Sequence, residues 1–543
     1  MSVARRITLP DLSDDENDTL ARLLYQLAGY ERFNRLVDSY YDASRNMRRA
    51  HGGVVPPQYY RLGLVLGWTS KAVDALARRC NLDGLVWADG DLDSLGYREL
   101  WDGNRLASET DQGVTSSLIH ATSFVVASRG EEGEPQALVH FADAADATGE
   151  WNTRTRLLDA MVWVNDRDDK GAPKALTLYL DGRTVTGWYE DGAWNSDVSE
   201  HPFPVPAAPL PYRPRLKRPF GRSRISRPVR GIQDAAAREL VRLEGHMDVY
   251  SFPEFWMLGA DESVFTNADG SLKAQWEIML GRIKGIPDDM DLMNSDAPQL
   301  SRADVKKFDA ASPEPHLAAL NTYSKLFARE TSLPDSSVAI TDVANPTSAE
   351  AYDSAQYELI AEAEGATDEW SPALRYVTRI ALAMQNGLSE VPPEWLTIDT
   401  RWRDPRYQSR AAMADAGSKQ IAAMPGLADT EVGLELLGLD QQQIDRVIAE
   451  RRRARVADTM TALASVAPPE ADEDEPGEPA QPAATEEADV LKAKFDALGV
   501  AVRAGVSPED AAARLGLAGI TFTGATPVSL RQPESAADEF EER

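Results

Sequence analysis

The sequence predicts an α+β protein that is mainly helical, and three observations lead to this class. Long segments near both ends of the chain repeat apolar residues at helical spacing. A block between residues 122 and 198 instead contains short apolar runs separated by Asp-Gly turns, which indicates strands. The composition, 43% hydrophobic and 27% charged, is typical of a globular chain with a buried core.

The charge balance and the cysteine content exclude several classes of protein. The 543 residues include 87 acidic and 57 basic side chains, so the formal net charge is −30. A charge this negative repels nucleic acid as a general surface, which disfavours a DNA-wrapping or polybasic membrane role. The single cysteine, Cys80, excludes an intrachain disulfide. No apolar run is long enough to span a membrane, and the N-terminus lacks the apolar stretch of a signal peptide. We therefore expect a soluble protein of a reducing compartment, with no membrane partner.

The chain contains no recognisable catalytic motif, so we expect that it is not an enzyme. No glycine is followed by another glycine two positions later, which excludes a dinucleotide-binding G-x-G-x-x-G, and no P-loop occurs. The closest two of the six histidines are 20 residues apart, so no helical turn carries a pair of metal ligands. The acidic clusters at 166–169 and 288–291 lack the spacing of a calcium loop and are interpreted as solvated turns. We expect no metal site, no catalytic residue and no cofactor.

The first 80 residues predict two helices. Ser13 and Glu16 form a capping-box pattern at the start of the first helix. The apolar stripe of that helix follows at i, i+3, i+4 and i+7, as Leu20, Leu23, Leu24 and Leu27. A second helix is predicted over residues 62–80, with one apolar side that ends at Cys80.

The middle of the chain predicts a small antiparallel sheet followed by a stiff connector. Five strands are expected, at residues 124–127, 137–141, 161–164, 176–180 and 185–189. Asp181-Gly182 is a two-residue hairpin signal, and Asp191-Gly192 predicts a further turn. Six prolines between residues 202 and 214 then favour an extended connector.

One basic stretch interrupts this acidic chain. Residues 213–230 contain eight basic side chains and no acidic one. Such a stretch could contact phosphates, could pair with acidic surface on another copy, or could be solvated. Because the charges are not interleaved with a pattern of aromatic residues suited to base stacking, we favour a subunit contact. The candidate contact residues are Arg218, Arg222, Arg224, Arg227 and Arg230.

The second half of the chain is predicted to be largely helical. Helices are expected at about 233–250 and from Pro315 to before Leu333, separated by a mixed, turn-rich region. A loop at 331–346 precedes a long helix at 347–386, which is interrupted at Gly365 and at Ser371-Pro372. A helical module at 405–466, a disordered acidic linker at 467–489 and a short tail at 490–543 follow.

The order of these parts resembles the portal proteins (head-to-tail connectors) of long-tailed bacteriophages, particularly those that infect actinobacteria. No single motif is a chemical fingerprint, and the resemblance depends on the order and spacing of several motifs along nearly the whole chain. They are Tyr40-Tyr41-Asp42, Leu66-Gly67-Trp68, Val73-Asp74-Ala75-Leu76-Ala77, Gly221-Arg222-Ser223-Arg224-Ile225, Gln233-Asp234-Ala235-Ala236, Pro315-His316-Leu317, Leu326-Phe327-Ala328, Asn345-Pro346-Thr347-Ser348-Ala349-Glu350-Ala351 and Gly505-Val506-Ser507-Pro508-Glu509-Asp510-Ala511-Ala512.

The resemblance implies a portal fold with wing, stem, clip and crown, assembled as a ring around a central DNA channel. The implied parts are a wing at 1–210, stem helices and clip at 211–330, a tunnel loop at 331–346, a long kinked wing helix and its return at 347–404 and a crown at 405–466. The linker at 467–489 and the tail at 490–543 lie outside the core portal fold. The tunnel-loop residues expected to face DNA are Asp335, Ser336, Ser337, Thr341, Asp342 and Asn345.

The resemblance also implies a function and a set of partners. The ring, usually of twelve subunits, would occupy one capsid vertex of the virion after assembly in the host cytoplasm. Double-stranded DNA would be packaged and ejected through it. The implied protein partners are the terminase large subunit, the major capsid protein, the scaffold and the head–tail adaptor. The alternatives are a terminase-like enzyme, which the missing P-loop disfavours, and a minor capsid or tail-adaptor protein without a channel.

Overall fold

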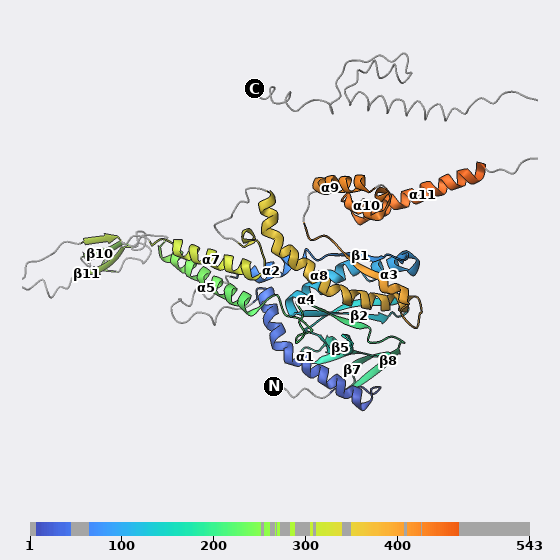
Figure 1. Ribbon diagram of the computed structural model, residues 1–543. Coiled ribbons are helices and arrows are strands. Elements are labelled where there is room, and N and C mark those ends of the chain that lie inside the picture. The colour runs from blue at the N-terminus through green and yellow to red at the C-terminus, as the bar shows by residue number, and fades with distance from the viewer. Residues whose placement is uncertain are drawn as a thin grey trace, which may run out of the picture. The chain divides into compact units, whose positions relative to one another are not determined.

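The structure is a computed structural model that describes residues 7–44, 65–250, 255–260, 267, 269–271, 283–287, 304–307, 311–338, 349–406, 410–424 and 426–465. The chain divides into two compact units, Met1–Asp445 and Arg446–Arg543. Helices and strands both build the first unit, with more residues in helices, so the predicted α+β class is confirmed (Figure 1).

Helix α1 (Asp14–Tyr41) covers a five-stranded antiparallel sheet. The capping box forms as predicted, since Ser13 Oγ accepts from the Glu16 amide at 3.4 Å and Glu16 Oε2 accepts from the Ser13 amide at 2.9 Å. Leu20 and Leu23 of the predicted stripe pack into an apolar cluster with this sheet. In spatial order the strands are β4 (Ala147–Trp151), β5 (Leu158–Arg167), β6 (Pro173–Leu180), β7 (Arg183–Glu190) and β8 (Ala193–Glu200).

Both predicted Asp-Gly turns in this sheet are confirmed. Gly182 joins β6 to β7 with a φ of +79°, and Asp191 and Gly192 join β7 to β8 with φ of +51° and +86°. Two consecutive positive φ values are the geometry of a two-residue hairpin turn, which Asp-Gly tolerates best.

A second, three-stranded sheet corrects two predictions. The expected strands do not form one sheet, because β2 (Thr122–Arg129) lies between β3 (Ala137–Asp143) and β9 (Ala207–Pro211) and pairs with neither β5 nor β6. The proline-rich segment is therefore not simply a connector: residues 207–211 are an edge strand, where a missing amide donor is tolerated. Residues 205–210 are buried, since they pack between the sheet and its neighbours.

The alternating side chains of β2 connect the layers of this part of the first unit. Val125 and Ala127 face a core formed with α4 (Leu106–His120) and α8 (Ala349–Gln385). Phe124 and Val126 face the other way, toward Met161 of the five-stranded sheet. Three apolar clusters therefore join the layers: one lies between β2 and the helices α4 and α8, one between the two sheets, and one between the five-stranded sheet and α1.

The long helix α8 is one continuous helix, although an interruption was predicted at Gly365 and Ser371-Pro372. Pro372 lies inside it, and Figure 1 shows the helix bent. Proline removes one backbone hydrogen bond and bends a helix without necessarily ending it. Next to the proline, the Ser371 hydroxyl accepts from the Trp402 indole (2.9 Å) and the Thr400 hydroxyl (2.8 Å). These contacts fix α8 against the strand β13 (Ile398–Trp402).

Two short strands and several short helices complete the described part of the first unit around α8 and β13. β13 pairs antiparallel with β1 (Leu82–Trp87). Helix α2 begins later than predicted, because residues 65–67 are not helical; residues 62–64 lie outside the described part. It also ends earlier, because the amides of Arg79 and Cys80 form i−3 turn hydrogen bonds instead of helical ones. The bounds of these elements are α2 (Trp68–Ala77), η3 (Leu92–Leu95), α3 (Tyr97–Gly103) and η7 (Pro393–Thr397).

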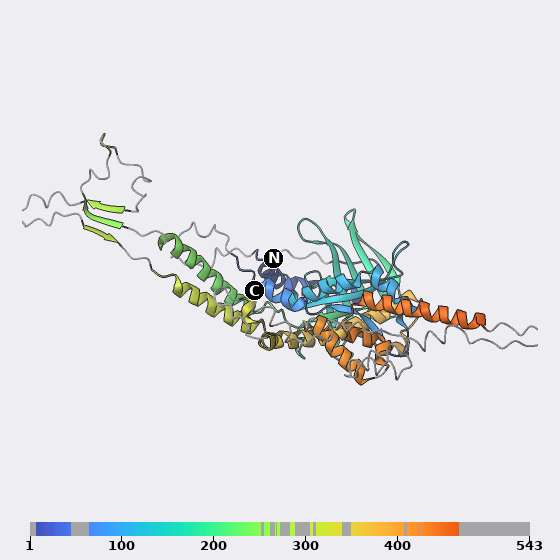
Figure 2. The same ribbon diagram turned by 90° about the horizontal axis from the view of Figure 1, so that it is seen from above.

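Two helices far apart in sequence form an antiparallel pair. In Figure 2, α5 (Arg227–Tyr250) and α7 (Glu314–Glu330) lie side by side. His316 contacts Glu239 (Nδ1 to Oε1, 2.6 Å), and His246 contacts the carbonyl oxygen of Ala311 (2.9 Å). The two helices therefore run in opposite directions. The chain segment that connects α5 to α7 contains the described strands β10 (Phe255–Ala260), β11 (Ile283–Pro287) and β12 (Asp304–Lys307). They form a sheet in the order β11-β10-β12.

The predicted helical module after residue 405 contains three α-helices and a short 3-10 helix within the described ranges. They are α9 (Arg410–Ala423), η8 (Leu427–Asp429), α10 (Glu431–Leu436) and α11 (Gln441–Ser465). Arg401 of β13 reaches Glu435 of α10 at 2.7 Å, which attaches α10 to the two-stranded sheet. The predicted linker at 467–489 and tail at 490–543 lie outside the described residues.

Candidate functional site

The basic stretch begins as a tight hairpin that follows β9. Arg215 and Arg218 exchange both backbone hydrogen bonds, at 3.1 and 2.6 Å, around the turn residues Leu216 and Lys217. Gly221 closes the loop with a φ of +72°, and a Cβ there would lie 2.3 Å from the Tyr212 carbonyl oxygen. Only glycine fits this position, so the hairpin geometry is fixed by the sequence.

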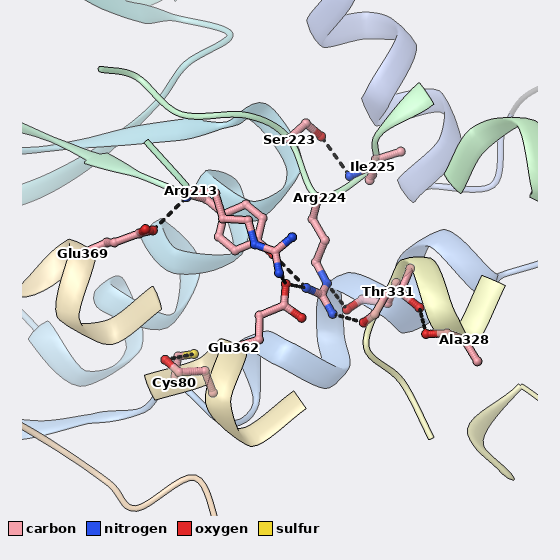
Figure 3. A network of polar contacts seen from close by, with 12 residues as sticks. Cys80, Arg213, Ser223, Arg224, Ile225, Ala328, Thr331, Glu362 and Glu369 are labelled. Atoms are coloured by element: carbon pink, nitrogen blue, oxygen red, sulfur yellow. Dashed lines mark hydrogen bonds and ion pairs between the residues drawn. The ribbon is translucent and has the colours of Figure 1, made fainter. Parts of the chain in front are cut away.

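Arg224, three residues beyond the hairpin, is the centre of a buried polar network (Figure 3). The residue is 6% exposed. Its Nε donates to the Ala72 carbonyl oxygen of α2 (2.9 Å) and its Nη2 to the Thr331 carbonyl oxygen at the end of α7 (2.6 Å). Its Nη1 donates to the Tyr212 hydroxyl (2.8 Å) and forms an ion pair with Glu362 of α8. One guanidinium therefore joins four segments of the chain.

Glu362 is the acidic partner of this network, and its side chain is 5% exposed. Its Oε1 contacts Arg224, the Tyr212 hydroxyl and Nη2 of Arg213, the last at 2.7 Å. Its Oε2 is buried and accepts no hydrogen bond from a described residue. The carboxylate therefore depends on its arginines for compensation of its charge.

The network affects the pKa values of its members. Burial alone would lower the pKa of Arg224, but the charges and hydrogen bonds of Tyr212 and Glu362 outweigh it and raise the pKa. Burial raises the pKa of Tyr212 to about 12, so its hydroxyl stays protonated and can donate to Glu362. Burial also raises the pKa of nearby Cys80 to about 12, which leaves an unreactive thiol.

The network holds the start of the predicted tunnel loop. Thr331 follows α7 directly, and its hydroxyl donates to the Phe327 carbonyl oxygen (2.7 Å). The carbonyl oxygen of Thr331 accepts from Arg224. Four residues later the chain forms the short helix η6 (Asp335–Ser337). Asp335, Ser336 and Ser337 are all exposed there. Thr341, Asp342 and Asn345 lie outside the described residues, so the DNA-facing role of the six residues stays a prediction.

The structure separates the five predicted contact arginines into two kinds. Arg224 is buried and bonded within its own chain, so it is removed from the candidate subunit contacts. Arg230 also packs internally: Nη1 donates to the Ile225 carbonyl oxygen (2.9 Å), and the guanidinium lies over the rings of Phe33 and Tyr40. Arg218, Arg222 and Arg227 are exposed. The role of Glu362 was not predicted, since only its place beside the buried stripe of the long helix distinguishes it from the other glutamates of that helix.

A second polar cluster centres on His120, the buried last residue of α4. Its Nε2 lies 2.6 Å from Oδ1 of Asp38 on α1, and its Nδ1 lies 3.0 Å from Oδ2 of Asp143 on β3. The second contact has the distance of an ion pair but not the geometry of a hydrogen bond. Burial would lower the pKa of His120, yet the two carboxylates raise it to about 9. The same interaction, together with Ser116, lowers the pKa of Asp143 against the effect of burial.

The described part of the chain has neither a metal site nor a membrane-spanning helix. No group of three or more His, Cys, Asp or Glu side chains there has the arrangement of a metal site. Among those residues no helix combines the length and the apolar character needed to cross a bilayer.

Comparison with known proteins identifies relatives over most of the chain. The family model described as phage portal protein, SPP1 Gp6-like, matches residues 29–456. The portal protein of Mycobacterium phage L5 is 27% identical over 402 residues, which cover 72% of this chain and 79% of the relative. The portal protein of Mycobacterium phage D29 is 28% identical over 426 residues, which cover 77% and 83%.

The solved structures that the chain matches include chains from gene transfer agent (GTA) particles. A chain of the neck of the native particle, computed with C12 symmetry, matches 68% of this chain and 89% of its own length, at 15% identity and a TM-score of 0.33. A chain of the native GTA virion matches 74% and 99%, at 16% identity and a TM-score of 0.33.

Proposed function

Because the chain belongs to the SPP1 Gp6-like family of phage portal proteins, we propose that its copies form a ring at one capsid vertex, through which double-stranded DNA is packaged and ejected. The observation that carries this proposal is the family match, which spans residues 29–456 and therefore most of the described fold. The match favours a portal over the alternative of a minor capsid or adaptor protein. The proposed role is structural, without a catalytic residue or a cofactor.

The described elements fit the parts that such a ring needs. The antiparallel pair α5 and α7 is suited to a stem, and the segment between them, with its small sheet, to a clip that contacts terminase and later the adaptor. The bent α8 is suited to a wing helix that follows a tunnel loop at 331–346. Residues 1–210 would complete the wing, and 405–466 would form the crown. Capsid protein and scaffold would surround the ring during assembly in the host cytoplasm.

The proposed tunnel loop has a charge suited to a sliding polymer. Residues 331–346 contain Asp335 and Asp342 and no basic side chain. A positive lining would bind phosphates and release counterions, which would hold DNA in place. A negative lining repels the phosphates and lowers the friction. Exposure of Asp335 on η6 is compatible with this role.

Reversal of this charge is expected to slow packaging. The double variant Asp335→Lys/Asp342→Lys should package DNA at least several-fold more slowly or stall, because each new lysine can hold a passing phosphate. The measurement is the rate of DNA protected from nuclease in a packaging reaction with terminase and capsids. Asp89→Lys, an exposed charge reversal far from this loop in sequence, is the control. Packaging by the double variant at the wild-type rate would contradict the role of the loop.

The ring itself is tested by light scattering and negative-stain images of the same purified fraction. We expect a mass near twelve times 59.5 kDa and axial views with a central hole. A compact dimer without a hole in the capsid-bound and the free protein would overturn it.

A further inference from the structure

The tip of the hairpin at 213–221 exposes an apolar side chain to solvent. Leu216 is 100% exposed, the highest fraction among the exposed large hydrophobic residues of the described chain. It occupies the turn that the Arg215–Arg218 backbone bonds close. A single exposed leucine is ordinary on a protein surface. Here, however, the two backbone bonds between Arg215 and Arg218 fix the turn that carries Leu216, which places its side chain to contact a partner.

The base of this hairpin is held on both sides. On one side, the Arg213 amide donates to Glu369 (2.8 Å) and the Arg213 guanidinium reaches Glu362 (2.7 Å), both on α8. On the other side, the ring of Phe220 packs against Phe124 and Trp151, with centroids 5.9 and 6.2 Å apart. A tip on such a base loses little conformational freedom when it binds, so more of its contact energy appears as affinity.

The charges beside Leu216 select the kind of partner. Arg215, Lys217 and Arg218 are exposed, and none forms an ion pair with another described residue. The chain has 87 acidic against 57 basic side chains, so another copy offers an excess of carboxylates with which the three cations can pair. Phosphates of DNA would attract the three cations but leave Leu216 in water. A protein surface with an apolar hollow and acidic rim satisfies both features.

We propose that this hairpin is an intersubunit anchor, which inserts Leu216 into the acidic surface of a neighbouring copy while Arg215, Lys217 and Arg218 pair with carboxylates around it. The inference rests on the proposed ring and deepens it, since it assigns one element of the interface. The basic stretch then serves two purposes: its buried part, Arg224, holds the fold together, and its exposed tip joins copies.

A crosslinking experiment on the assembled protein tests the contact. Subunits labelled with ¹⁴N and ¹⁵N, each with p-benzoylphenylalanine in place of Leu216, are mixed, assembled and irradiated. We expect crosslinked peptides of mixed isotope composition, with the partner peptide rich in Asp and Glu. The control places the same photoreactive residue at Leu396, which is 65% exposed on η7.

The outcomes are separable. Four results would each overturn the anchor and leave the ring in place. They are crosslinks of single isotope composition only, no crosslinks in intact rings, crosslinks to added DNA instead of protein, and an equal yield of mixed crosslinks at position 396. Absence of any ring in the wild-type chain would overturn the proposed function together with this inference.

A substitution gives an independent readout. Leu216→Asp should raise the concentration at which rings dissociate by roughly tenfold or more, because it puts a like charge against the acidic neighbour. Leu396→Asp is the matched control and should leave dissociation unchanged. Since both leucines are largely exposed, the circular dichroism of both variants should equal that of the wild type. Unaltered ring dissociation in Leu216→Asp would overturn the anchor.

Discussion

Arg224→Ala is expected to lower the free energy of unfolding of the first unit by about 3–5 kcal/mol. The substitution leaves the Glu362 carboxylate buried with only Arg213 and Tyr212 beside it. It also removes the donors to the carbonyl oxygens of Ala72 and Thr331. The loss of one partner from a buried ion pair is among the largest single penalties in a folded protein, because it removes most of the compensation of the remaining charge. Urea unfolding followed by tryptophan fluorescence measures the change.

The matched control is Arg222→Ala, an exposed arginine two residues away, which should change stability by no more than about 0.5 kcal/mol. The double variant Arg224→Met/Glu362→Met should be less destabilised than Arg224→Ala, because no unpaired buried charge remains. Equal losses for Arg222→Ala and Arg224→Ala would show that the network contributes no special stability.

Raising the pH from 6.5 to above 9 is expected to remove about 3 kcal/mol of stability through His120. The pKa of His120 is about 9 in the folded chain against an ordinary 6.5. A raised folded pKa means that the charged histidine stabilises the fold fully below pH 6.5. This contribution is then lost as the pH rises through 9, when the imidazole deprotonates between Asp38 and Asp143.

The His120→Gln variant isolates this effect. It should be less stable than the wild type near pH 6, and the difference should shrink as the pH approaches 10. His140 and His201 have lowered pKa values, so they change charge below pH 6.5. Their titration therefore does not contribute to the change in stability between pH 6.5 and 9.5. A wild-type stability that does not change between pH 6.5 and 9.5 would contradict the ion-pair interpretation of the cluster.

Local signals in the sequence predicted much of the fold. The capping box of α1 and the turns at Gly182 and Gly192 depend on neighbouring residues alone, and all three formed where expected. The strand β9 was missed, because its prolines disfavour a strand and only pairing with the distant β2 compensates. The continuity of α8 through Pro372 likewise depends on long-range contacts with Thr400 and Trp402.

The candidate site was less predictable than the fold. The stretch at 213–230 stands out by charge, but charge alone does not separate Arg224, which is buried, from Arg222, which is exposed. That distinction arises from Glu362, which lies far away in sequence. A weak signal existed: Glu362 lies between Leu359 and Ala363, two positions of the buried stripe of α8.

The most direct measurement is an electron cryo-microscopy reconstruction of DNA-filled particles, focused on the vertex that joins the tail. We expect a ring of this chain around axial density for double-stranded DNA, with Asp335, Ser336 and Ser337 on the side that faces the channel. A vertex whose channel is built from another protein, or a ring of this chain with no DNA on its axis during packaging, would contradict it.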